Sequence, residues 1–128
     1  MMEITEHFSR EEFDCHDGTP YPKEWIADRL KPLCEALEEM RAIGTGPMHI
    51  TSGYRTESWN HSVGGAKDSQ HVQGRAADIQ LFGIPPVVLH AAIERLIEEG
   101  KIPDGGLGLY SRWVHYDQRG SHARWKGP

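Results

Sequence analysis

Two histidines and one aspartate are placed where they can meet at a single metal ion. His71 lies in a polar stretch, Asp78 lies on the strand expected to follow it, and His115 lies on a strand expected near the end of the chain. Zn²⁺ suits two imidazoles and one carboxylate, because its catalytic sites take three protein ligands and leave a fourth position for water. The residues therefore predict a zinc site formed by His71, Asp78 and His115. In the alternative interpretation, Asp78 forms a salt bridge at a strand end and His115 is a half-buried histidine with satisfied hydrogen bonds.

Hydrophobic periodicity predicts the helices that must support such a site. Apolar residues recur every three or four positions over residues 25–43, which is typical of an amphipathic helix. Pro32 is expected to kink this helix or to split it near Leu30. A second amphipathic helix is expected over residues 85–100. Both helices present an apolar face that must pack on other elements.

Strands are predicted where apolar and polar residues alternate. Residues 48–52 form the first strand and residues 76–82 the second, in which Asp78 points away from the aliphatic face. The long polar loop between them is expected to carry a site, because compact domains keep such loops for a use. Residues 105–110 and 113–119 are expected to pair as a final hairpin, and the polar tail beyond it is expected to fray.

Size and composition fit a single domain over residues 1–128. The chain has 128 residues, of which 38% are hydrophobic and 26% charged, so a packed core is expected. The expected architecture is α+β, with helices packed on one face of a small, mainly antiparallel sheet. The formal net charge of -5 offers no surface for nucleic-acid phosphates or an anionic membrane.

The chain shows no segment that would direct it into a membrane. No stretch approaches the ~20 apolar residues of a membrane span. The N-terminal residues lack the basic and apolar regions of a signal peptide. We therefore expect synthesis in the cytoplasm, no stable membrane insertion, and a monomer.

The two cysteines, Cys15 and Cys34, could form one disulfide bridge, and the sequence does not decide whether they do. Cys15 also stands beside His16 and Asp17, a combination that can hold a metal. In a loop with Gly and Pro, these residues favour a turn and an N-cap over a metal site.

One run of residues resembles the first zinc motif of the D-Ala-D-Ala metallopeptidases. The run is Ser69-x-His71-x-x-Gly74-x-Ala76-x-Asp78. The family contains zinc D-alanyl-D-alanine carboxypeptidases, dipeptidases and phage-type peptidoglycan endopeptidases. Segments similar to the rest of the family's site precede and follow the run in order, at residues 50–55, 60–66, 106–110 and 114–117.

The resemblance implies a fold like that of the Hedgehog and DD-peptidase proteins, and a zinc-dependent metallopeptidase. The implied substrates are peptidoglycan stem peptides of the cell wall, cleaved by a D-Ala-D-Ala carboxypeptidase or by an endopeptidase such as a phage endolysin. Arg55 stands at the position of the family's substrate-binding arginine, where a guanidinium can bind a carboxylate or stabilise an oxyanion. Ser69 and Tyr110 are expected beside it as substrate-binding residues. In the alternative interpretation, Arg55 is a strand-end arginine paired with an acid.

The chain departs from the family at the general base. Many members carry Glu or Asp three residues before the last histidine ligand, where this chain has Arg112, and others carry a histidine at the position of Tyr110. Asp117 is the leading candidate for the catalytic base, because it shares a strand face with His115 and the two side chains emerge ~7 Å apart. Its alternative role is to orient a ligand imidazole, and His61 is a weaker candidate for the base. The departure leaves a second function open, a non-catalytic zinc-binding module of the cell wall or of a phage structure.

Overall fold

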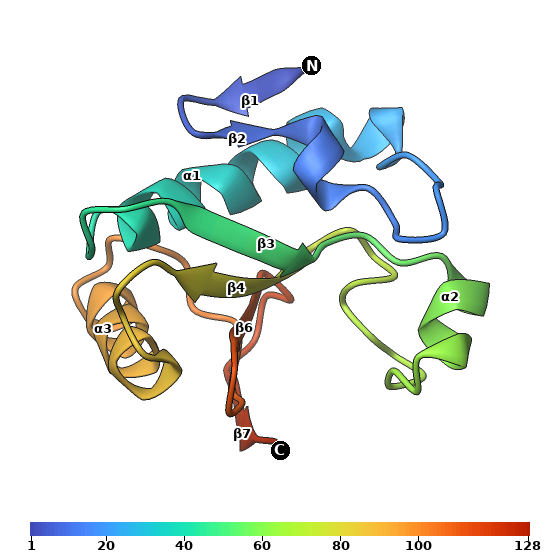
Figure 1. The fold of residues 1–128 in the computed structure, drawn as a ribbon. Coiled ribbons are helices and arrows are strands. Elements are labelled where there is room, and N and C mark those ends of the chain that lie inside the picture. The colour runs from blue at the N-terminus through green and yellow to red at the C-terminus, as the bar shows by residue number, and fades with distance from the viewer.

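The four predicted strands and the C-terminal tail form a five-stranded sheet in the computed structural model, which describes residues 1–128 (Figure 1). The strand order is β3-β4-β6-β5-β7, and every neighbouring pair is antiparallel except β5 with β7. The strands are β3 (Met48–Ser52), β4 (Ala76–Leu81), β5 (Gly106–Leu109), β6 (Val114–Asp117) and β7 (Ala123–Lys126). The α+β class and the mainly antiparallel sheet expected from the sequence are confirmed.

Three α-helices and three shorter helical segments accompany the sheet. They are α1 (Lys31–Arg41), α2 (Glu57–Ser62), α3 (Pro86–Glu98), η1 (Arg10–Phe13), η2 (Lys23–Trp25) and η3 (Ile26–Leu30). A separate two-stranded sheet consists of β1 (Glu3–Thr5) and β2 (Phe8–Ser9). The helix expected over residues 25–43 is not interrupted at Leu30, where the backbone stays helical, but it changes there from the π-helical η3 to α1. Pro32, which lacks a backbone N–H, is tolerated in the first turn of α1. None of the helices combines the length and the apolar character needed to cross a membrane.

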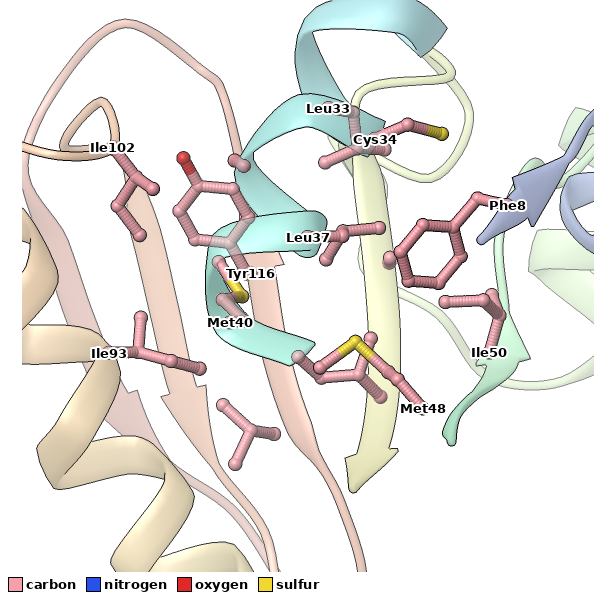
Figure 2. Close-up of a cluster of buried hydrophobic side chains, with 14 of the residues drawn as sticks. Phe8, Leu33, Cys34, Leu37, Met40, Met48, Ile50, Ile93, Ile102 and Tyr116 are labelled. Atoms are coloured by element: carbon pink, nitrogen blue, oxygen red, sulfur yellow. The ribbon is translucent and has the colours of Figure 1, made fainter. Parts of the chain in front are cut away.

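A cluster of 20 buried residues joins helices and strands in one core. Figure 2 shows Leu37 of α1 between Phe8 of β2 and Tyr116 of β6. In β4, the aliphatic residues at alternate positions enter this core, namely Ala77, Ile79 and Leu81. Asp78 lies on the other face of β4, as the alternation predicted. Core packing therefore decides which face of the sheet carries the polar residues.

The polar tail is ordered as strand β7, so the expectation that it frays is wrong. The strand pairs in parallel with β5, beginning at Ala123 opposite Gly106. Arg124 donates two hydrogen bonds to the carboxylate of Glu94 on α3, at 2.7 and 2.8 Å, and a third to Asp104 at 2.9 Å. Arg124 of the tail thus has partners far away in the sequence, which local polarity does not reveal.

The cysteines do not form the bridge that the sequence left open. Cys15 and Cys34 are both buried free thiols. Asp17, beside Cys15, accepts hydrogen bonds from the Thr19 N–H at 2.9 Å and from the Thr56 hydroxyl at 2.8 Å. The first bond closes the turn that was favoured over a metal site, and the second links this turn to Thr56, the N-cap residue of α2.

Candidate metal centre

Asp78 and His115 are direct partners in the antiparallel pairing of β4 with β6. Their side chains lie on the face opposite the apolar core, yet the two residues are only 6% and 7% exposed. His115 Nδ1 lies 3.0 Å from Asp78 Oδ1. The register of two strands therefore brings two of the predicted ligands into contact.

His71 reaches the same point from the loop between α2 and β4. Its carbonyl accepts a hydrogen bond from the N–H of Arg55 at 3.1 Å. The turn after it is held at Gly74, whose carbonyl accepts from the Tyr21 hydroxyl at 2.6 Å. Gly74 has a φ of 68°, and a Cβ there would collide with neighbouring aromatic side chains, so the turn requires glycine. This turn places His71 Nε2 3.3 Å from Asp78 Oδ2.

The donor atoms of His71, Asp78 and His115 all lie within 4.8 Å of one another. His71 Nδ1 donates to the Gly53 carbonyl at 2.7 Å, which leaves the lone pair of Nε2 directed at Asp78. Two imidazole nitrogens and one carboxylate oxygen form a donor set that Zn²⁺ prefers. The residues present therefore fit a zinc ion, and the fold brings together all three ligands predicted from the sequence.

Asp117 is fully buried behind the imidazole of His115. Its Oδ2 lies 2.7 Å from His115 Nε2 and accepts from Arg119 Nη2 at 2.7 Å, while its Oδ1 accepts from the Gly106 N–H at 3.0 Å and from Arg119 Nε at 2.9 Å. A general base must reach the proton that it removes. With no exposed surface and both oxygens engaged, Asp117 does not meet this requirement, contrary to the role expected first. Its position matches the alternative, in which it orients a ligand imidazole through the second nitrogen.

Burial and hydrogen bonding together set the charges of this cluster. Burial lowers the pKa of His71, so its imidazole is neutral and available as a ligand. Burial opposes ionisation of Asp78, but the hydrogen bond from His115 outweighs it and holds the pKa well below its usual range. Burial opposes protonation of His115, but hydrogen bonds to Asp117 and Asp78 outweigh it and raise that pKa. A metal ion that binds Nδ1 of His115 must therefore displace a proton.

Arg55 lies beside the predicted ligands and is largely buried. Its Nη2 lies 3.6 Å from Asp78 Oδ2, its Nη1 donates to Asn60 Oδ1 at 3.1 Å, and its Nε donates to the Ser52 hydroxyl at 3.2 Å. The guanidinium is thus paired with an acid, as the alternative interpretation expected. It also lines the cleft in which the ligands lie.

The three ligands line an open cleft of about 680 Å³. One side of it is an aromatic wall of Tyr110, Trp113 and Trp125. The rings of Tyr110 and Trp113 stack with centroids 4.6 Å apart, and Trp125 Nε1 donates to the Tyr110 hydroxyl at 2.9 Å. Tyr110 therefore lies where a substrate-binding residue was expected.

The loop that carries His71 forms another part of the cleft. Ser69 lines it, and its hydroxyl accepts a hydrogen bond from the N–H of His71 at 3.2 Å. This bond gives Ser69 a part in shaping the loop as well as a place beside the ligands. His61 lines a neighbouring polar groove and not the cleft itself.

The sequence patterns did not point to Arg119 or Trp125, although both line the cleft. The available signal was the alternation of Gly106 with Gly108, because glycine within a strand often marks the close approach of another group. A Cβ at Gly106 would collide with the carboxylate of Asp117, and a Cβ at Gly108 would collide with the indole of Trp125. The glycines of β5 thus make room for the indole of Trp125 and for the carboxylate of Asp117, which binds Arg119.

Comparison with known proteins identifies the family. A family model described as Peptidase M15 matches residues 6–117, so the chain belongs to the Peptidase M15 family. It is 33% identical over 87 residues to the "Probable peptidoglycan L,D-endopeptidase MepK" of Haemophilus influenzae, a match that covers 62% of this chain and 43% of the relative. It is 43% identical over 44 residues to the zinc D-Ala-D-Ala carboxypeptidase of Streptomyces albus G, covering 34% of this chain and 17% of the relative. The chain therefore matches less than half the length of either relative, and the family resemblance expected from the sequence is confirmed.

We expect one zinc ion per chain, and we expect His71→Ala and His115→Ala to lose it or to bind it far more weakly, because each variant lacks one of three ligands. Metal analysis after dialysis and calorimetric titration would measure this. His49→Ala, at an exposed position of β3, is the matched control. Normal zinc content in both ligand variants would show that the metal binds elsewhere.

Asp117→Asn should weaken zinc binding by about 10- to 100-fold, the usual effect of removing a partner of a ligand imidazole. Excess zinc should then restore much of the activity. Zinc titration together with kcat at saturating metal would test this. Near-normal affinity combined with a loss of about 10²- to 10⁴-fold in kcat would instead return Asp117 to the role of general base.

Proposed function

We propose that this chain is a zinc-dependent peptidase that hydrolyses peptide bonds in the peptidoglycan stem peptides of the cell wall. The observation that carries the proposal is the buried group of His71, Asp78 and His115 in an open cleft, within a chain of the Peptidase M15 family. The names of the two relatives, a peptidoglycan endopeptidase and a zinc carboxypeptidase, support this substrate class. When bound, zinc supplies a Lewis acid and lowers the pKa of a water ligand towards ~7.

In this proposal the three ligands hold the metal and their neighbours fix its surroundings. Asp117 holds the imidazole of His115 through Nε2, and Arg119 balances the charge of Asp117 through hydrogen bonds to both of its oxygens. Arg55 places a positive charge beside Asp78 at the cleft. There it can stabilise the negative charge that develops on a substrate carbonyl during hydrolysis.

In the proposed hydrolysis, the residue that accepts the proton lies outside β6. Apart from the ligands and the two arginines, the titratable side chains that line the cleft are Asp68 and Tyr110. Asp68 lies on the loop before His71, and Tyr110 follows β5. We assign proton transfer to one of this pair, in place of the carboxylate that many family members carry at the position of Arg112.

The surface around the ligands favours cleavage of an internal bond. A second groove, lined in part by His16, Trp59 and Arg112, meets the cleft at Arg55 and Asp78. A peptide bound at the ligands can therefore continue in both directions. A carboxypeptidase needs room for only one residue beyond the cleaved bond, so the open geometry supports an endopeptidase.

We also propose that residues 1–128 form a single domain that acts as a monomer, with α1 and α3 on one face of the sheet. In support, one core contains Leu37 of α1, Ile93 of α3 and Ile79 of β4. Helix α3 also contacts β4, β5 and β6 directly. The ligands lie on the opposite face of β4 and β6, open to substrate.

Purified peptidoglycan treated with the zinc-loaded chain should release fragments cut at an internal stem-peptide bond. Liquid chromatography with mass spectrometry would identify the bond. The chelated chain and His71→Ala serve as controls that should release nothing. Release of single terminal residues would replace the endopeptidase with a carboxypeptidase, and a zinc-loaded chain without any product would favour the non-catalytic module.

Arg55→Ala should lower kcat/KM by more than about tenfold while zinc stays bound, because the guanidinium faces the substrate and touches no metal-binding nitrogen. Arg55→Lys keeps the charge without the fork and should recover part of the loss. Arg41→Ala, on α1, controls for loss of a positive charge. If Arg55→Ala lost zinc as well as activity, the role of Arg55 would instead be to hold Asp78 in place for the metal.

A further inference from the structure

Trp125 on β7 reaches the proposed ligand His115 across an intervening strand. His115, Gly108 and Trp125 are successive register partners on β6, β5 and β7. In most sheets a side chain on the middle strand would lie between the side chains of the two outer residues, here His115 and Trp125. The centroids of the imidazole and the indole are nevertheless only 5.0 Å apart. Trp125 lies beyond the residues matched by the family model, which ends at Asp117.

The contact depends on glycine at position 108. A Cβ on Gly108 would collide with three atoms of the indole ring. The residue on its N-terminal side, Leu107, points into the apolar core. The missing side chain therefore opens a path on the site face of β5, and the indole of Trp125 occupies it.

The indole is fixed from several directions. Its Nε1 donates to the Tyr110 hydroxyl at 2.9 Å, and the guanidinium of Arg119 lies 5.1 Å from its ring centroid. Arg119 also binds Asp117, which holds Nε2 of His115. Trp125, Arg119, Asp117 and His115 thus form a closed ring of contacts around one imidazole.

The opposite face of β7 anchors the strand. Arg124 points away from the cleft and binds Glu94 of α3 through two hydrogen bonds. Alternation along the strand then directs Trp125 toward the cleft. One strand therefore joins the helical side of the molecule to the metal site.

We infer that Trp125 is a positioning residue for the metal ligand His115. Asp117 holds the ring at Nε2 and Asp78 meets it at Nδ1, so the imidazole plane can still rotate about the line through these two atoms. The indole packs against that ring and restricts this rotation, so that Nδ1 stays directed at Asp78. The inference rests on the metal site of the proposed function and does not depend on its substrate.

The test compares zinc affinity in two variants of the same aromatic wall. Trp125→Ala should weaken zinc binding by about 10- to 100-fold, as loss of other support of a ligand imidazole does. Trp113→Ala removes an equally large ring that is stacked on Tyr110, and it should leave zinc affinity unchanged. Competition with a chelating dye measures the affinity, and thermal melting of the metal-free proteins checks that both variants fold.

Two further variants keep the inference testable if Trp125→Ala does not fold. Trp125→Phe retains a ring against His115 and should recover most of the affinity. Gly108→Ala leaves Trp125 in the sequence but displaces its indole, so it should weaken zinc in the same direction as Trp125→Ala. Cobalt substitution adds a spectroscopic readout, because the visible absorption of Co²⁺ reports ligand geometry and should change in Trp125→Ala and Gly108→Ala only.

A folded Trp125→Ala protein with wild-type zinc affinity and an unchanged cobalt spectrum would overturn the inference. Equal weakening in Trp113→Ala would overturn it too, since the effect would then come from general loosening of the wall. A wild-type chain that binds zinc but cleaves no stem peptide would refute the proposed function alone. The comparison of metal affinities would remain valid in that case.

Discussion

The antiparallel pairing of β4 with β6 is the constraint on which the site depends. It sets Asp78 opposite His115, and the same register sends Ile79 and Val114 into the core. Because side chains alternate along a strand, a slip of one residue would turn the proposed ligands into apolar surroundings and expose the aliphatic residues. Burial of apolar side chains on one face of the sheet thus fixes the positions of the polar side chains on the other face.

The buried charges of the site are balanced within the sheet and its edges. Ionised carboxylates are costly to bury unless hydrogen bonds and opposite charges compensate them. Asp117 meets this condition through Arg119, and Asp78 meets it through the imidazole of His115 and the nearby guanidinium of Arg55. No buried polar atom of a side chain lacks a hydrogen-bond partner.

Features encoded by local spacing were predictable from the sequence, and features that depend on distant partners were not. The convergence of His71, Asp78 and His115 followed from strand alternation and from a motif within a short segment. Strand β7 was missed because its partners lie on β5 and α3, far away in the sequence. Only part of the position of Asp117 could be predicted. Alternation gives the face on which its carboxylate emerges, but not which nitrogen of His115 it meets.

The two nitrogens of the His115 imidazole decide what Asp117 can do. Nδ1 faces Asp78, so only Nε2 remains for a neighbour on the same strand. Asp117 therefore meets the imidazole at the nitrogen opposite to the one that faces Asp78, where it can orient the ring but lies away from the cleft side of His115. In the proposed reaction a general base would therefore come from outside β6, and the loop with Asp68 and the turn with Tyr110 border the cleft. The sheet thus fixes two of the three proposed ligands, whereas the loops supply the third, His71, and in the proposed reaction would also supply proton transfer.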